Sequence, residues 1–355
     1  MVNRRVLLVG SLPFENEPAA MAEAMHRVGE HLWSLPDGEV GERTEDCPGG
    51  TRSAWVQTIM DRCEADTSNW TVKRRAKRNV GGYAADYTSG PRLKPKHTPK
   101  DTAQHLDFGW ADAARQSYPE FVRLRASSDR GDLRFQVGLP TGMGATFGMM
   151  DPITAMRYAD AFSERMATEA NEILRFTEPG DLAFQIEVPG ELAFAHKLPK
   201  ALAGLAAKRV IDLVERIETG APIGIHLCFG DLNNEALINA PTLDKAVAFT
   251  NALLQRWPAR HELSYIHFPL AEAAEPPPMD RAYYKPLGQL LVPNKTKFVA
   301  GFVHPSRSID ELRQIRDHIE SIRGHEVDIA CSCGMGRVEP ETAKRLLDTS
   351  AELTR

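Results

Sequence analysis

Cysteine is scarce in this sequence. The 355 residues contain five cysteines, which are Cys47, Cys63, Cys228, Cys331 and Cys333. An odd and sparse set does not provide the paired framework on which small secreted domains depend, so we expect a reducing, cytoplasmic location. Because thiols are so few, cysteines that lie close to one another or to a histidine are informative.

Long apolar runs and an excess of positive charge are also missing. No stretch approaches the about 18 apolar residues that a membrane-spanning helix needs, and the apolar run at 6–9 is too short for a signal peptide. The formal net charge is -5, which argues against a general nucleic-acid-binding protein. We therefore expect neither a membrane nor nucleic acid among the partners.

Short apolar segments alternate with amphipathic ones along most of the chain. The strand-like segments are 5–12, 30–35, 133–140, 182–189, 223–228, 263–268, 297–303 and 327–330. The helical patterns are 21–29, 112–126, 151–176, 201–217, 242–255, 308–322 and 339–353. Eight strands with intervening helices predict an α/β fold, a single (β/α)8 barrel of the TIM type. A doubly wound sheet is the alternative, but no Gly-x-Gly-x-x-Gly follows the first strand.

The whole chain, residues 1–355, is predicted to form one barrel domain. Residues 42–131 are rich in Arg, Lys, Asp, Gly and Pro and contain few large apolar residues. Such a segment cannot bury a core of its own, so we predict an extended loop that is inserted after the second strand.

Soft metal ligands fall at two strand ends. His226 and Cys228 lie two residues apart at the end of the fifth strand, where alternate side chains point to the same side. Cys331 and Cys333 follow the eighth strand with the same spacing. The carboxyl ends of barrel strands share one face, and imidazole and thiolate are typical zinc ligands. We predict a zinc site with His226, Cys228 and one of the later cysteines. A packed thiol beside a hydrogen-bonded histidine is the alternative.

Other polar residues fall at the ends of other predicted strands, and the motifs around them resemble those of a known family. These residues include Ser11, Glu39, Glu187, His267 and His304. The motifs are Val-Gly-Ser-Leu-Pro at 9–13, Asp-Gly-Glu at 37–39, Phe-Gln-Ile-Glu-Val-Pro at 184–189, His-Leu-Cys at 226–228, Val-His-Pro-Ser-Arg at 303–307 and Cys-Gly at 333–334. In this order they resemble the C-terminal catalytic barrel of cobalamin-independent methionine synthase and its shorter stand-alone relatives.

The resemblance implies zinc-dependent transfer of an alkyl group, methyl above all, to a small thiol such as homocysteine. It implies that Cys333 is the last zinc ligand, that Ser11, Glu39 and Glu187 bind the substrate, and that His304 donates a proton. Methyl-folate is then a candidate alkyl donor, and we expect a monomer or a homodimer.

Two departures from the family pattern affect the site. The family's third zinc ligand is a glutamate, whereas His267 stands at that position here, with Glu272 just beyond it as an alternative ligand. Glu187 replaces an aspartate. These changes concern the substrate more than the metal. They leave open a zinc-dependent lyase or hydrolase on the same barrel, or a zinc-binding protein with a degraded site. The metal-free decarboxylase branch of the superfamily does not need the His-x-Cys motif.

Overall fold

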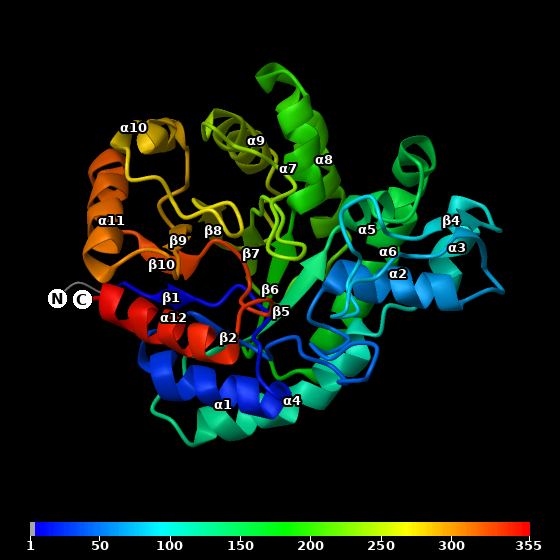
Figure 1. Ribbon diagram of the computed structural model, residues 1–355, viewed down its shortest axis with the longest axis horizontal. Helices are drawn as coiled ribbons and strands as arrows, with labels where there is room; N and C mark the ends of the chain where they lie inside the picture. Colours follow the sequence, from blue (N-terminus) through cyan, green and yellow to red (C-terminus); the bar gives the residue numbers. More distant parts are fainter. Residues whose placement is uncertain (1–3) are drawn as a thin grey trace.

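The computed structural model describes residues 4–355 and confirms the predicted (β/α)8 barrel (Figure 1). Residues 1–3, which begin the predicted domain, lie outside the described part. The parallel strands follow the order β1, β10, β9, β8, β7, β6, β5, β2. They span Val6–Leu7 (β1), Ser34–Pro36 (β2), Arg134–Pro140 (β5), Leu182–Glu187 (β6), Ile223–His226 (β7), Leu263–Pro269 (β8), Lys297–Val303 (β9) and Asp328–Cys331 (β10). A parallel bridge between Val6 and Leu32 joins the two edges of the sheet, so the barrel is nearly closed.

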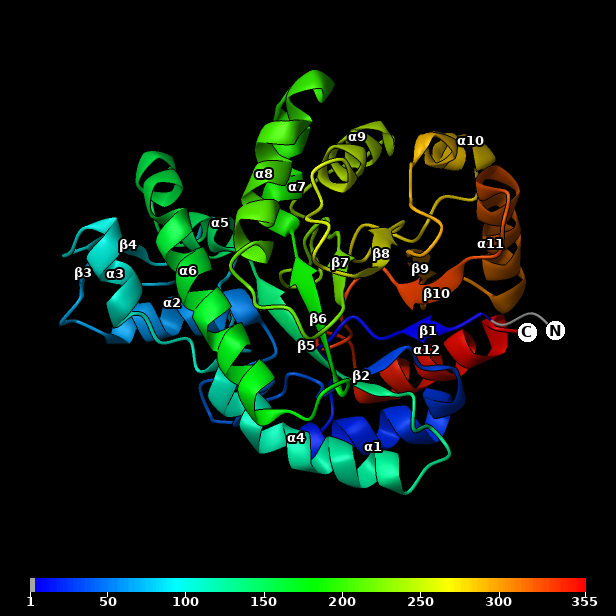
Figure 2. The same ribbon diagram turned by 180° about the vertical axis from the view of Figure 1, so that it is seen from behind.

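Helices surround the strands, as Figures 1 and 2 show from opposite sides. The outer helices are Glu17–Val28 (α1), Trp110–Ala126 (α4), Pro152–Phe176 (α6), Ala203–Val214 (α8), Asp244–Leu254 (α9), Ile309–Arg323 (α11) and Pro340–Leu353 (α12). Shorter elements are Gly142–Phe147 (α5), Pro189–Lys197 (α7), Arg281–Tyr284 (α10), Gly29–His31 (η1), Lys200–Leu202 (η2) and Lys285–Gln289 (η3). Asp151 caps α6, and Ser308 with Glu311 forms a capping box on α11. Within residues 4–355, no helix has the length and apolar character needed to cross a membrane.

The segment 42–131 has more structure than its composition indicates. It contains Trp55–Ala65 (α2), an antiparallel pair made of Trp70–Arg74 (β3) and Arg92–Pro95 (β4), and Pro99–His105 (α3). These elements lie to the right of the strands in Figure 1. The segment also includes α4, which packs against α1 and α6 as part of the outer layer of the barrel. The assignment of the chain to one domain stays a prediction.

Two buried amides support the segment that follows β1. Gln136 Nε2 donates to the carbonyls of Leu8 and Val9, at 2.8 and 3.0 Å, and Gln185 Nε2 donates to the Val9 carbonyl at 2.6 Å. Tyr265, which fills the barrel beneath them, donates from its hydroxyl to Gln185 Oε1 at 2.9 Å. Side chains therefore hold the backbone at 8–9 in place of a neighbouring strand.

Candidate metal centre

Strand register brings three of the predicted site residues into one row. In the parallel pairing of β6, β7 and β8, Glu187 is the partner of His226, and His226 is the partner of His267. All three side chains are buried. Cys228 follows two residues after His226, at the carboxyl end of β7, and Cys333 follows β10 from the other side of the barrel. The row and the two thiols therefore meet at the carboxyl face, where barrel enzymes place their chemistry.

Three potential ligand atoms gather here. Nitrogen or sulfur atoms of His226, Cys228 and Cys333 all lie within 4.8 Å of one another. The two sulfurs are 3.5 Å apart, and Cys333 Sγ is 3.9 Å from His226 Nε2. A tetrahedral zinc ion with bonds of about 2.3 Å to sulfur and about 2.0 Å to nitrogen would place such atoms about 3.5 to 3.8 Å apart. The spacing and the donor types therefore fit zinc.

The Cys333 thiol is protonated unless something replaces its proton. Its contact with Cys228 and its burial raise the pKa of the Cys333 thiol well above the usual range. Arg337 lies nearby, with Nη2 3.8 Å from Cys333 Sγ. The same guanidinium is already paired with Asp231, at 2.6 and 3.0 Å. A protonated thiol such as Cys333 is a poor nucleophile, but it becomes a good ligand when a metal ion takes the place of its proton.

Burial keeps both histidine rings neutral, and hydrogen bonds determine which nitrogen of each ring carries the proton. Burial lowers the pKa of His267 to about 4 and the pKa of His226 well below its usual range, so both rings are neutral at pH 7. His267 Nε2 lies 2.9 Å from the Cys331 carbonyl, which can only accept, so this nitrogen carries the proton. His267 Nδ1 must then accept from His226 Nδ1, 2.8 Å away. The remaining nitrogen of His226, Nε2, is left with a free lone pair that is available to a metal ion.

His267 and the alternative ligands lie outside the group of three. Both nitrogens of His267 are engaged, so this side chain does not offer a ligand atom in the described arrangement. Cys331 contributes its carbonyl to His267, and the residue lines two smaller cavities of about 250 and 740 Å³. Glu272 accepts a hydrogen bond from the Ala240 amide at 2.6 Å. Within residues 4–355, the group that could hold a metal consists of His226, Cys228 and Cys333.

All three potential ligands line a cavity of about 1250 Å³ that opens to solvent. Ser11, Glu39 and Glu187, the predicted substrate-binding residues, line it as well. A Cβ atom at Gly138 would lie 2.7 Å from Glu187 Oε1 and 2.9 Å from Glu39 Oε1, so the two carboxyl groups lie over the same strand residue. Burial raises the pKa of Glu187 to about 7, and burial together with the nearby Glu187 raises the pKa of Glu39.

His304 lies on the far side of Cys333. It lines the cavity of about 740 Å³ together with Cys333 and Arg337. Its Nδ1 accepts from the Ser306 amide, and its Nε2 lies 3.2 Å from the Ala273 carbonyl. Burial lowers the pKa of His304, so the ring is neutral at pH 7 and both nitrogens have partners within the protein. The structure does not bring His304 into the larger cavity.

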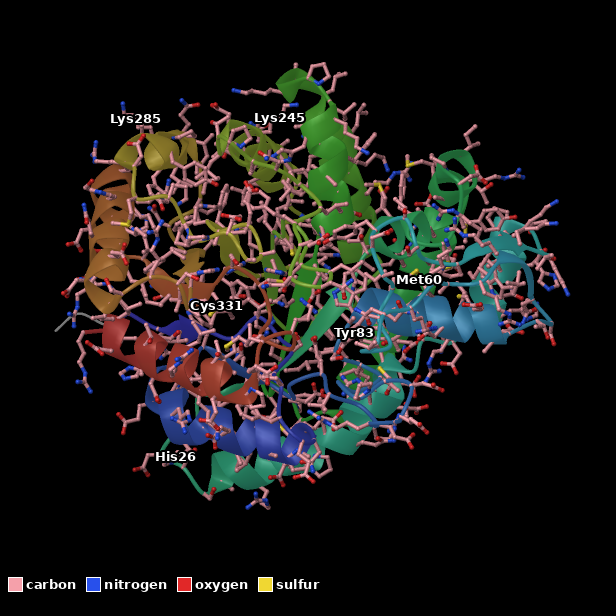
Figure 3. The ribbon with its side chains drawn as sticks, in the orientation of Figure 1. His26, Met60, Tyr83, Lys245, Lys285 and Cys331 are labelled. Carbon is pink, nitrogen blue, oxygen red and sulfur yellow. The ribbon has the colours of Figure 1, made fainter. Side chains whose placement is uncertain are left out.

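Residues of segment 42–131 line the larger cavity. Asn233, in the loop after β7, donates to the carbonyls of Ala84 and Ala85 and pairs with Asn79. The Tyr87 hydroxyl donates to the Glu235 carbonyl. Figure 3 places Tyr83 and Met60, which belong to this segment, to the right of Cys331 on β10. The inserted segment and the loop after β7 thus form one wall of the site.

Comparisons with known proteins come from structure alone. No protein-family model and no curated protein sequence matches this chain. A B12-independent methionine synthase from Shewanella sp. W3-18-1, solved with selenomethionine, is similar in structure with a TM-score of 0.59 and 12% identity, over 99% of this chain and 97% of that one. This likeness establishes the fold. A putative B12-independent methionine synthase from Listeria monocytogenes gives a TM-score of 0.41 at 11% identity, over 66% of this chain and 67% of its own.

Proposed function

We propose that this protein is a zinc-dependent enzyme that transfers an alkyl group, methyl in the first instance, to a small thiol such as homocysteine. One observation carries the proposal: the three soft ligand atoms have zinc-like spacing and face a large open cavity. Three protein ligands leave a fourth position for a substrate, as catalytic zinc sites do. The five free thiols fit a cytoplasmic location, which is part of the proposal. The structural likeness to a methionine synthase adds support through the fold.

His226, Cys228 and Cys333 would hold the zinc, and His267 would orient His226. Zinc in this position would lower the pKa of a bound thiol and present the thiolate for alkylation. Ser11, Glu39 and Glu187 line the cavity close to the ligands and would bind polar parts of the substrate. Ser11 Oγ also accepts from the Gly336 amide at 3.3 Å, which ties the Cys333 loop to the end of the first strand segment. His304 as proton donor would require its present hydrogen bonds to open.

Zinc-edge X-ray absorption tests the proposal directly. We expect about one zinc per chain, with two sulfur ligands in the resting protein and a third after homocysteine is added. If a third sulfur ligand appears only after another thiol is added, the mechanism stands and that thiol replaces homocysteine as the acceptor. Zinc whose ligands never change would instead favour the lyase, hydrolase or non-catalytic alternatives. Protein that contains no zinc and takes none up would refute the proposal.

Replacing His267 with phenylalanine tests its positioning role. The His267→Phe ring fills similar space but cannot accept the proton of His226 Nδ1, so the zinc-binding tautomer loses its support. We expect zinc affinity to fall about 10- to 100-fold, the range found when hydrogen-bond partners of metal ligands are removed. Competition with a chromogenic chelator measures this change, and nitrogen NMR shifts report the tautomer of His226. The exposed His325→Phe is the matched control. An unchanged affinity in His267→Phe would show that His226 needs no such support.

A further inference from the structure

Part of the wall of the larger cavity is apolar. It is formed by Trp55, Val56 and Met60 of α2, Phe147 at the end of α5, and Leu232 and Leu237 in the loop after β7. Phe147 and Leu237 stay 38% and 42% exposed at this wall. Large apolar side chains that remain exposed around a concave site mark a surface that an apolar partner covers.

Acidic side chains outnumber basic ones around this cavity. Four acidic side chains line it, which are Glu39, Asp86, Glu187 and Asp231. Of the described residues that line it, Arg337 is the only lysine or arginine. Its guanidinium is already occupied by Asp231 and by the Ser53 carbonyl. On a ligand part that packs against the apolar wall, a carboxylate or phosphate would therefore lose its hydration without gaining a free cation as a partner, and this carries a high cost.

We infer that the alkyl donor is an uncharged molecule with a largely apolar, ring-sized body, and that the part entering this cavity bears no anionic group. The inference rests on the proposed function for the reaction itself. The inference therefore excludes a donor whose carboxylate groups enter the cavity, such as methyl-folate with its glutamate.

The reaction balances without any further reactant. The thiol loses its proton, and its sulfur forms a bond to the alkyl carbon of the donor. The bond between that carbon and the donor's oxygen, nitrogen or sulfur atom breaks, and this atom keeps the electron pair. It then takes up one proton, so the proton lost by the thiol is recovered on the leaving group. No electrons are gained or lost overall.

Two matched probes test the charge preference. Methyl 4-tolyl sulfide is uncharged, and 4-(methylthio)benzoate has the same ring and methylthio group with a carboxylate in place of the tolyl methyl. We expect the uncharged probe to bind the full-length protein at least about tenfold more tightly at pH 8, measured by isothermal titration calorimetry, because the carboxylate would lose its hydration without gaining a free cation as a partner. Equal or tighter binding of the benzoate, or binding of neither probe, would overturn the inference.

A lysine placed on the apolar wall should cancel this preference. In Val56→Lys an ammonium group would face the cavity, so we expect the benzoate to gain at least about fivefold in affinity relative to the sulfide. Val122→Lys, on the outer face of α4, is the control and should keep the original ratio. The same ratio in both variants would contradict the inference.

Both probes are measured with and without zinc. A protein that lacks zinc but still prefers the uncharged probe would therefore refute the proposed function and leave this inference standing.

Discussion

Cys333→Ser is expected to lose its stoichiometric zinc and, with it, any transfer to a thiol. The serine hydroxyl is not deprotonated at neutral pH and is a poor zinc ligand, so the site would keep only His226 and Cys228. Structural zinc sites bind with about 10 to 16 kcal/mol in total, so the loss of one thiolate should cost roughly 3 kcal/mol, which is a hundredfold or more in affinity. Zinc content after dialysis against a weak chelator measures the effect.

Cys331→Ser is the matched control, because it changes the same chemical group two residues away. The Cys331 thiol lies outside the group of ligand atoms, and only its carbonyl takes part in the site, through His267. The carbonyl is unaffected by the substitution, so zinc content should be retained. If Cys331→Ser loses zinc and Cys333→Ser keeps it, the assignment of the third ligand is reversed.

Arg337→Met is expected to destabilise the fold by about 3 to 5 kcal/mol. Arg337 and Asp231 form a largely buried pair, with side chains 15% and 8% exposed. Removing only the arginine leaves the Asp231 carboxylate without its partner in a poorly solvated place, and breaking a buried pair in this way costs several kcal/mol. Urea denaturation measures the free energy of unfolding, with zinc content matched between the proteins.

The double variant Arg337→Met, Asp231→Leu is the control for this effect. Because it removes both charges, no unpaired carboxylate is left, and we expect most of the lost stability to return. If the double variant is as unstable as Arg337→Met alone, the loss comes from packing and from the Ser53 contact rather than from the unpaired charge.

Most of the barrel could be predicted from apolar periodicity, and the exceptions have local causes. The strand at 297–303 is confirmed at the predicted bounds. The first predicted strand, at 5–12, shrinks to Val6–Leu7 because side-chain amides bind the carbonyls of Leu8 and Val9. The second, at 30–35, begins late because η1 occupies Gly29–His31. Periodicity does not describe the amide contacts, because Gln136 lies more than a hundred positions from Leu8 and Val9.

The site was predictable where spacing alone decides which residues meet. The i, i+2 spacing at the end of one strand brings His226 and Cys228 to the carboxyl face of the barrel. Spacing leaves Cys331 and Cys333 open as the next ligand, and only the family resemblance favours Cys333, which lies with the other two in the structure. The environment of His267 could not be predicted, because it depends on the β7–β8 register and on the irregularity in β10 at Ala330 and Cys331. Nor could the pairing of Arg337 with Asp231, because the two residues lie 106 positions apart in the sequence.

The pairing of the first strand with the last one also determines when the site can form during biosynthesis. β1 is held on one side by β10, through pairs such as Val6 with Ile329, and on the other by the single bridge to Leu32. The Arg5 amide and the Asp328 carboxylate, which bond at the same seam, are 323 positions apart. Contacts between such distant residues form slowly and late. We therefore expect a nascent chain to carry His226 and Cys228 as an incomplete pair. The third ligand would arrive only when the ribosome has delivered β10 and the barrel has closed.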